Sequence, residues 1–304
     1  MITVILAGGF GTRLAPLSEH HAKALLPVAD KPIIDWIIEK TPASRVLISV
    51  NEKFASDFAK WAKDKPVEII SEKATKNEEK LGAVGGIVYA IKNKEITEPV
   101  LLVNGDNIFD FPLKDITGSK ENVINLLYDI KDKEKIKGKY GNARVEDGFI
   151  TEFLEKPQNP VSSFVSAGIY YFPVWAFASI KEFYESDAKD KDNIGSLLEW
   201  MRKKKKTKIK AIIKEGIWLD IGSRQSYIQA NQVFSKLDSF ISPSAKIINS
   251  SVKNSVVLKN CRISNSEING CIIDEECLVE DANLKDKIVG RGERIIRNGV
   301  ASRE

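Results

Sequence analysis

The first 240 residues alternate between short apolar runs and longer stretches in which apolar residues recur at helical spacing. In residues 32–40, for example, Ile33, Ile34 and Ile37 fall on one side of a helix. The pattern predicts strands at 2–7, 46–50, 67–70 and 100–104, and helices at 32–40, 54–63, 85–93 and 194–201. Near-continuous apolar strands that alternate with helices are typical of an α/β fold, with a mostly parallel sheet covered by helices on both faces.

A different rhythm begins after residue 240. Aliphatic residues recur there every five or six positions, with small and polar residues between them: Ile241, Ile247, Val252, Val257, Ile263, Ile268, Ile273 and Leu278. A helical period of 3.6 residues does not produce this spacing. A coil of short parallel strands does, because each aliphatic side chain points inward and stacks on the next turn of the coil. A run of exposed β-hairpins is the alternative.

Composition marks a boundary at the same place. All five Trp, seven Tyr and thirteen Phe lie at or before Phe240, and all three cysteines, Cys261, Cys271 and Cys277, lie after it. The interior of a narrow coil accepts aliphatic side chains and small cysteines more readily than aromatic rings. We therefore expect two domains, residues 1–236 and residues 237–304.

Charge and residue counts exclude several classes of protein. Lys and Arg number 46 against 42 Asp and Glu, and a net charge of +4 is too small to indicate a nucleic-acid partner. Three cysteines without a C-x-x-C pair argue against a disulfide framework and a cysteine zinc site, so we expect a cytoplasmic protein. No apolar run approaches the length of a membrane helix, and residues 1–9 predict no secretory signal. The only histidines, His20 and His21, are adjacent, and we expect them in a loop rather than at a metal.

The first strand ends in a glycine-rich loop, Gly8-Gly9-Phe10-Gly11-Thr12-Arg13-Leu14. Glycines at this position let backbone N–H groups approach an anion. A dinucleotide fingerprint would need glycine where Leu14 stands, and a Walker loop would need Gly-Lys-Ser/Thr. What remains is a phosphate loop that contains an arginine, a side chain suited to phosphate oxygens, and is followed by a second cation, Lys23.

With the motifs that follow it, this loop resembles the sugar-1-phosphate nucleotidyltransferase family. The resemblance is carried by residues 6–14, Lys23-Ala24-Leu25-Leu26-Pro27-Val28 and Lys31-Pro32-Ile33, and then by Asn104-Gly105-Asp106, Tyr140-Gly141, Phe153-Leu154-Glu155-Lys156-Pro157, Ala167-Gly168-Ile169-Tyr170 and Trp218-Leu219-Asp220-Ile221-Gly222. The tail resembles the left-handed β-helix that many members carry. The resemblance implies a Rossmann-like first domain and transfer of a nucleotide from an NTP to a sugar 1-phosphate, which releases pyrophosphate.

The same resemblance implies roles for individual residues. Nucleotide contacts would come from Leu6, Ala7, Gly8, Gly9, Gly11, Thr12, Arg13, Gly82, Asn104 and Gly105. Contacts to the sugar phosphate would come from Gly141, Glu155, Lys156, Ser166 and Gly168. Arg13, Lys23 and Lys156 would act in catalysis. At position 166 the family often has asparagine, so serine there departs from its pattern.

Two aspartates are expected at the ends of strands. Asp106 follows the apolar run 100–104, and Asp220 follows Ile217-Trp218-Leu219. Mg²⁺ is a hard ion that takes one or two carboxylates together with phosphate oxygens. We therefore expect Mg²⁺ as the cofactor, held by Asp106 and Asp220.

Several alternatives stay open. The segment Leu81-Gly82-Ala83-Val84-Gly85-Gly86 is nearer to guanylyl- and some uridylyltransferases, whereas Gly105-Asp106-Asn107 is common among thymidylyltransferases, so the base is undetermined. A non-catalytic paralogue that binds an NDP-sugar as a regulatory subunit is the main alternative function. An acetyltransferase in the tail is a poorer fit, because the tail is short and has no histidine. We expect a homo-oligomer whose contacts involve the tail, with NTP and sugar 1-phosphate as partners and neither nucleic acid nor membrane.

Overall fold

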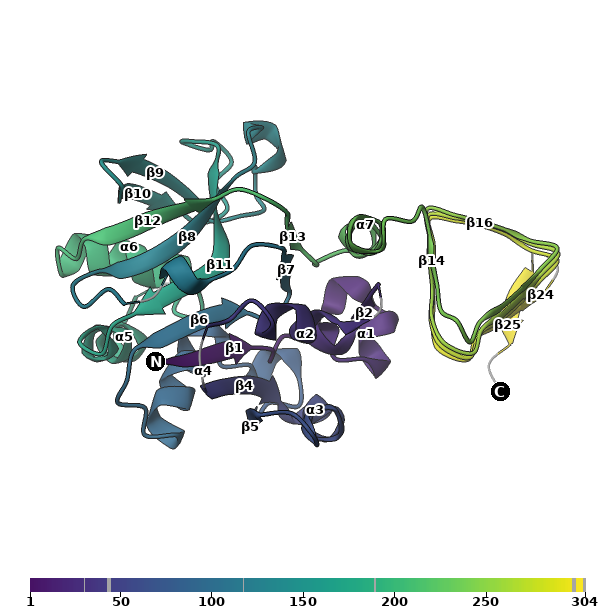
Figure 1. The fold of residues 1–304 in the computed structure, drawn as a ribbon, viewed down its shortest axis with the longest axis horizontal. Coiled ribbons are helices and arrows are strands. Elements are labelled where there is room, and N and C mark those ends of the chain that lie inside the picture. Colours follow the sequence, from purple (N-terminus) through teal and green to yellow (C-terminus); the bar gives the residue numbers. More distant parts are fainter. Residues whose placement is uncertain (30, 43–44, 117, 189, 297–298, 303–304) are drawn as a thin grey trace. The chain divides into compact units, whose positions relative to one another are not determined.

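The computed structural model describes residues 1–29, 31–42, 45–116, 118–188, 190–296 and 299–302 (Figure 1). The chain forms two compact units, and each contains residues from separate parts of the sequence. The first unit comprises Met1–Gly9 and Ile37–Trp218. The second comprises Phe10–Trp36 and Leu219–Glu304.

A nine-stranded sheet forms the centre of the first unit, with strand order β5-β4-β1-β6-β11-β8-β12-β10-β9. The strands are β1 (Ile2–Leu6), β4 (Arg45–Asn51), β5 (Val67–Glu72), β6 (Val100–Asn104), β8 (Val123–Asp129), β9 (Asn142–Glu146), β10 (Phe149–Leu154), β11 (Phe164–Phe172) and β12 (Ile209–Lys214). Two short strands, β7 (Asn107–Phe109) and β13 (Trp218–Asp220), lie outside this sheet. The predicted strands at 2–7, 46–50, 67–70 and 100–104 correspond to β1, β4, β5 and β6.

The sheet is mixed, which corrects the prediction of a mostly parallel one. β5, β4, β1 and β6 run parallel to one another, as do β8 and β12. β11 is antiparallel to both β6 and β8, and β10 is antiparallel to β9 and β12. Part of the reason is local: Asp147 and Gly148 join β9 to β10 with φ of 50° and 79°, and so short a turn connects only antiparallel strands.

The helices are α2 (Ile33–Ile38), α3 (Ala55–Ala62), α4 (Gly82–Asn93), α5 (Ala176–Glu185) and α6 (Ile194–Lys204). Short 3₁₀ turns occupy Glu52–Phe54, Asn77–Glu79, Lys114–Ile116 and Lys133–Lys135. Buried residues of α4, α5 and α6, among them Ile87, Phe183 and Leu198, form one apolar core with strand residues such as Val4 and Leu102. Ile2, Thr3, Val4 and Ile5 are all fully buried, so β1 is covered on both faces.

The tail, in the second unit, is a run of short parallel strands in three stacked sheets, as expected for a β-helix (Figure 1). The first sheet contains β14 (Phe240–Ile241), β17 (Val256–Val257), β20 (Ile272–Ile273) and β23 (Ile288–Val289). The second contains β15 (Lys246–Ile248), β18 (Arg262–Ser264), β21 (Leu278–Glu280), β24 (Arg294–Ile296) and the antiparallel β25 (Gly299–Ser302). The third contains β16 (Ser251–Lys253), β19 (Glu267–Asn269) and β22 (Asn283–Lys285). Parallel pairing rules out the β-hairpin alternative for these strands.

Each turn of the coil takes 16 residues, because Val257 pairs with Ile273 and Ile263 with Val279. Most of the predicted aliphatics point inward, and the three cysteines are buried among them. Leu278 was assigned wrongly, since it lies on the ladder of Arg262 and Arg294, whereas its neighbour Val279 is fully buried. Ile241 stacks on Val257 but is 37% exposed, because it belongs to the first turn of the coil.

The corners of the coil depend on residues with positive φ. Three sets of corner residues, 16 positions apart, have φ between 47° and 65° or at 71°: Asn249, Asn265 and Asp281; Asn254, Gly270 and Asp286; Asn260, Glu276 and Gly292. Asn, Asp and Gly adopt this left-handed conformation most readily. After a corner comes a small residue such as Ser250, whose hydroxyl accepts the Ser266 N–H of the next turn at 2.9 Å. Cys261, Cys271 and Cys277 occupy the same small-residue position.

The rest of the second unit packs on this coil. It comprises the 3₁₀ turns Thr12–Leu14 and Lys23–Leu25, α1 (Leu17–His20), the strand pair β2 (Pro27–Val28) and β3 (Lys31–Pro32), and α7 (Arg224–Ser235). Tyr227 of α7 donates to the Pro27 carbonyl at 2.7 Å, and Asn231 accepts the Ala29 N–H at 3.0 Å. Over the residues that the structure describes, the search for a helix with the length and apolar character of a membrane span finds none.

Candidate active site

The carboxyl ends of β1 and β6 bring the first part of the glycine loop to Asn104 and Gly105. Leu6 is in register with Asn104, and the Gly105 N–H donates to the Leu6 carbonyl at 2.8 Å. A Cβ on Gly105 would lie 2.8 Å from that carbonyl oxygen and 3.2 Å from the Ala7 Cβ, so only glycine allows this approach. The carboxyl edge of a parallel sheet is where α/β proteins bind ligands.

Asp106 follows directly, half-buried at this edge. The buried amide of Asn107 donates to the Asp106 Oδ1 at 3.1 Å and fixes the orientation of the carboxylate. Gly168, which interrupts the pairing of β11 with β8, lies against the same residues. A Cβ on Gly168 would lie 2.7 Å from the Asn104 Nδ2 and 2.8 Å from the Asn107 Nδ2. The predicted nucleotide and sugar sides therefore meet at Gly168.

The other predicted sugar-side residues lie close together. The Ser166 N–H donates to the Gly141 carbonyl at 2.8 Å, and a Cβ on Gly141 would lie 3.2 Å from the Glu155 Oε2. Lys156 has a φ of 44°, and its N–H donates to the Tyr140 carbonyl at 3.2 Å. Its ammonium lies 3.6 Å from the Glu155 carboxylate, and its side chain is 58% exposed. So exposed an ion pair is weak, which leaves Lys156 able to bind a phosphate instead.

Ser166 has a different environment from the other sugar-side residues. Its hydroxyl accepts from the Asn125 Nδ2 at 2.9 Å and donates to the Tyr170 hydroxyl at 3.0 Å. Burial raises the pKa of Tyr170, so this hydroxyl stays neutral. The Ser166 side chain is thus part of an internal network, and its backbone is what ties Gly141 to β11.

The sequence interpretation missed the start of α6. Asn193 caps this helix, and its Oδ1 accepts the Gly195 N–H at 2.7 Å. A Cβ on Gly195 would lie 2.7 Å from the Glu155 Oε2, so the first turn of α6 lies against the predicted sugar-binding glutamate. The available signal was an Asn cap with a glycine two residues later, which by itself indicates only a helix start.

Glu72 was missed as well. This buried carboxylate at the end of β5 accepts the Ser49 hydroxyl at 2.7 Å, and it lies 3.3 Å from where a Cβ of Gly8 would be. Burial raises its pKa. Near it, Gly82 begins α4 with a φ of 70°, and a Cβ there would overlap Asp192, whose carbonyl accepts the Ala83 N–H at 2.8 Å. The glycine at position 82 is therefore required by packing in the first unit.

The second unit holds the rest of the glycine loop. Gly11 has a φ of 63°, and a Cβ there would lie 3.6 Å from the Cβ and Cδ of Lys23. The Arg13 guanidinium lies against Gly222, where a Cβ would be 2.7 Å from its Nη2. The Gly222 N–H in turn donates to the Asp220 carbonyl at 3.1 Å. Thr12, Arg13, Lys23 and Asp220 thus gather in one part of this unit.

The donors fit a magnesium ion in chemistry. Asp106 belongs to the first unit and Asp220 to the second, and each is a half-buried carboxylate at or just beyond the end of a strand. In the described part of the chain no group of three or more His, Cys, Asp or Glu side chains could hold a metal by itself. One or two carboxylates completed by substrate phosphates is the usual arrangement for Mg²⁺, and the two aspartates meet that description.

Comparison with known proteins places the chain in a class of transferases. Residues 2–236 match the model of the nucleotidyl transferase family, and the protein belongs to that family. A relative named bifunctional protein GlmU, from Methanocaldococcus jannaschii, is 28% identical over 76% of this chain and 54% of its own length. The mannose-1-phosphate guanylyltransferase catalytic subunit beta of Drosophila melanogaster is 30% identical over 74% of this chain and 60% of its own length.

The fold has a counterpart among solved structures. A Bacillus anthracis protein assigned as a glucose-1-phosphate thymidylyltransferase, solved with sucrose, superposes with a TM-score of 0.64. The match covers 78% of this chain and 96% of that chain at 23% sequence identity, which is a likeness of fold. The chain spans just over half the length of the GlmU relative.

Proposed function

We propose that this protein transfers a nucleotide from an NTP to a sugar 1-phosphate and releases pyrophosphate. The observation that carries the proposal is the contact between Gly168 and the amides of Asn104 and Asn107. It brings β11, which carries the proposed sugar contacts, to the end of β6, where the proposed metal ligand Asp106 lies. Family membership supports the same class of reaction.

The proposed chemistry is an in-line attack by a phosphate oxygen of the sugar 1-phosphate on the α-phosphorus of the NTP. Lys156 anchors and orients the nucleophile, and Glu155 with the backbones of Gly141 and Gly168 holds the sugar. Arg13 binds the leaving pyrophosphate, and Lys23 assists on the phosphate side. Catalysis then consists of alignment and charge neutralisation, and no histidine is needed, because a phosphate monoester is already deprotonated near neutral pH.

The proposed metal ligands are Asp106 and Asp220. Bound Mg²⁺ would polarise the α-phosphate and neutralise developing charge. The amide of Asn107 holds the Asp106 carboxylate in one orientation. Nucleotide contacts come from the backbone of residues 6–9, 11–13, Gly82, Asn104 and Gly105, where glycines let N–H groups approach phosphate oxygens.

The proposed domain organisation follows the sequence. Residues 1–236 form a Rossmann-like catalytic domain, and residues 237–304 form a left-handed β-helix that contributes to a homo-oligomer. The family model ends at residue 236, and α7 ends at Ser235, which supports this division.

A direct assay tests the proposal. Each of the common NTPs is mixed with a panel of sugar 1-phosphates and Mg²⁺, and pyrophosphate release is followed with a coupled enzyme. We expect release with at least one pair, and the preferred pair identifies base and sugar. Binding of an NDP-sugar without any pyrophosphate release would instead support the regulatory paralogue. The Lys156→Ala variant serves as the control for release at this site.

A further inference from the structure

A buried carboxylate in the coil has no role in the coil itself. Asp274 follows β20 and is fully buried. Its position repeats every 16 residues as Ser242, Leu258, Asp274 and Gly290, since the Asp274 N–H bonds to the Val289 carbonyl as the Leu258 N–H bonds to the Ile273 carbonyl. One turn earlier this position holds leucine, so the stack does not need a charged group there. Burying a carboxylate is costly unless it is paired.

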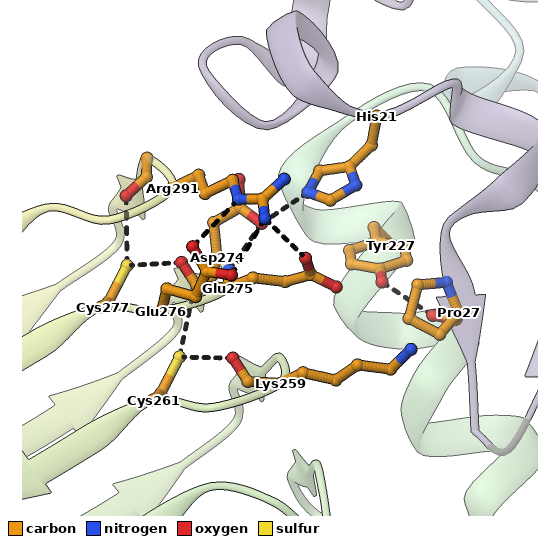
Figure 2. Close-up of polar contacts among 11 residues, drawn as sticks. His21, Pro27, Tyr227, Lys259, Cys261, Asp274, Glu275, Glu276, Cys277 and Arg291 are labelled. Atoms are coloured by element: carbon orange, nitrogen blue, oxygen red, sulfur yellow. Dashed lines mark hydrogen bonds and ion pairs between the residues drawn. The ribbon is translucent and has the colours of Figure 1, made fainter. Parts of the chain in front are cut away.

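The partner of Asp274 is His21, which lies in the second unit just after α1 (Figure 2). The His21 Nε2 donates to the Asp274 Oδ1 at 2.8 Å, and the same oxygen accepts the Glu275 N–H at 2.7 Å. The Oδ2 of Asp274 is buried without a hydrogen-bond partner among the described residues. Next to the pair, Arg291 is held by Glu276 at 2.9 Å and lies 3.9 Å from Glu275. Asp274 is therefore committed to His21.

His21 belongs to the segment that carries the proposed phosphate cations. It precedes Lys23 by two residues, and its N–H donates to the Leu17 carbonyl at 3.2 Å. Lys23 packs against Gly11, which adjoins the 3₁₀ turn of Thr12 and Arg13. A displacement of His21 would therefore move Lys23, and through Gly11 it would reach Arg13.

A second contact anchors the same segment to the same ladder. The ring of Pro16 lies 3.1 Å from where a Cβ of Gly290 would be, and Gly290 is the residue that stacks on Asp274. A side chain at position 290 would push Pro16 away. The coil therefore contacts the loop segment at two points on one face, Asp274 with His21 and Gly290 with Pro16.

We propose that Asp274 and His21 are positioning residues that fix the Gly11–Lys23 segment for binding of the NTP phosphates. This inference rests on the proposed function, and it gives the tail a part in catalysis beyond the oligomer contacts expected from its sequence. Neither residue is proposed to touch substrate. Both act through Lys23 and Arg13.

The test replaces Asp274 by the residue that the coil already accepts one turn earlier. Asp274→Leu removes the acceptor and keeps an apolar stack, and His21→Ala removes the donor. For both variants we expect KM for the NTP to rise about tenfold, with KM for the sugar 1-phosphate within about twofold, since only one substrate's site is loosened. His21→Gln retains a side-chain N–H donor and should restore most of the NTP affinity. Asp281→Asn, at an exposed corner of the coil, is the matched control and should change neither constant.

Hydrogen exchange gives a readout that does not need activity. Amides of residues 11–25 should exchange faster in Asp274→Leu and His21→Ala, while those of residues 256–273 keep their protection. A wild-type protein that shows no pyrophosphate release but shows this exchange pattern would overturn the proposed function and the role in NTP binding, leaving only the tether. Folded variants with unchanged exchange and unchanged KM for the NTP would overturn the positioning role, as would equal changes for both substrates.

Discussion

The sheet edge of the first unit and the coil corners of the second both contain residues with positive φ, but for different reasons. Gly168 has a φ of 71°, and its missing side chain leaves room for the amides of Asn104 and Asn107. At the corners the same conformation is adopted by Asn265, Asp281 and Gly270, and the side chains point into open surroundings or bond locally. The sheet edge needs the absence of a side chain, whereas the corner needs only a backbone conformation.

This difference separates a site from a scaffold. A corner that accepts Asn, Asp, Glu or Gly specifies only the geometry of the chain. A position at which any Cβ would meet a neighbouring polar group within about 3 Å ties two elements together, as Gly105 and Gly168 do. Substitutions should therefore affect activity at the sheet edge and only stability at the corners.

The largest effect is expected from Asp106→Asn. Loss of this carboxylate should reduce turnover by about two orders of magnitude or more, because metal binding stabilises charge on the transferring phosphate by several kcal/mol. Asp220→Asn should behave alike. Asp115→Asn, an exposed carboxylate paired with Lys214, is the control and should retain full turnover. Initial rates of pyrophosphate release measure all three, and full activity of the wild type in excess chelator would contradict the metal assignment.

Gly168→Ala should follow, with kcat/KM reduced by about a hundredfold as Asn104 and Asn107 are displaced. Gly148→Ala separates this contact from backbone strain. Gly148 also has positive φ, 79°, but nothing lies within 4 Å of where its Cβ would be. Both variants should lose about 1–3 kcal/mol of stability from strain, measured by urea unfolding. Equal activity of the two would show that the Gly168 contact has no part in the site.

Lys156→Ala should raise KM for the sugar 1-phosphate by about tenfold or more and leave KM for the NTP nearly unchanged, since one phosphate anchor is lost. Arg13→Ala should show the opposite preference. Steady-state kinetics with each substrate varied in turn checks both. Unchanged kinetics of Lys156→Ala would reduce Glu155–Pro157 to a surface turn.

The smallest effect is expected at a corner. Asn265→Ala should destabilise the protein by about 1 kcal/mol, because alanine adopts the left-handed conformation less readily than asparagine. Asn265→Gly should be close to neutral in stability. Neither variant should alter turnover, which thermal unfolding and the pyrophosphate assay together determine. A loss of activity in either variant would show that the corner reaches the site.

The part of the fold that the sequence predicts best is the part with periodic burial. The strands β1, β4, β5 and β6 are near-continuous apolar runs, and the coil repeats one pattern per side, so local spacing was enough. The antiparallel strands β8 to β11 were not predicted, because their partners are set by long-range pairing such as that of Tyr170 with Leu102 and Asn125. Leu278 failed for a related reason, since a one-residue choice of register decides which side chain faces inward.

For the candidate site, motifs identified the residues, and the structure supplied their relations. Gly105, Asp106, Gly141, Glu155 and Gly168 carried a family pattern, and they lie at one edge of the first unit. Glu72 and Gly195 carried no pattern, because a glutamate at a strand end and a glycine after a helix cap are ordinary in sequence. His21 looked like an incidental loop residue, since its partner Asp274 lies 253 positions away.

The 16-residue repeat of the coil also turns length into address. Because every turn is equivalent in its backbone, whole turns can be gained or lost by duplication or deletion of 16 residues without disturbing the stack. The contact with His21, however, depends on how many turns separate α7 from Asp274. Deleting residues 243–258 would bring Gly290 to the place of Asp274, so a change that is silent for the scaffold would erase the anchor. The chain is thus free to grow beyond Gly290 and constrained in its count before it.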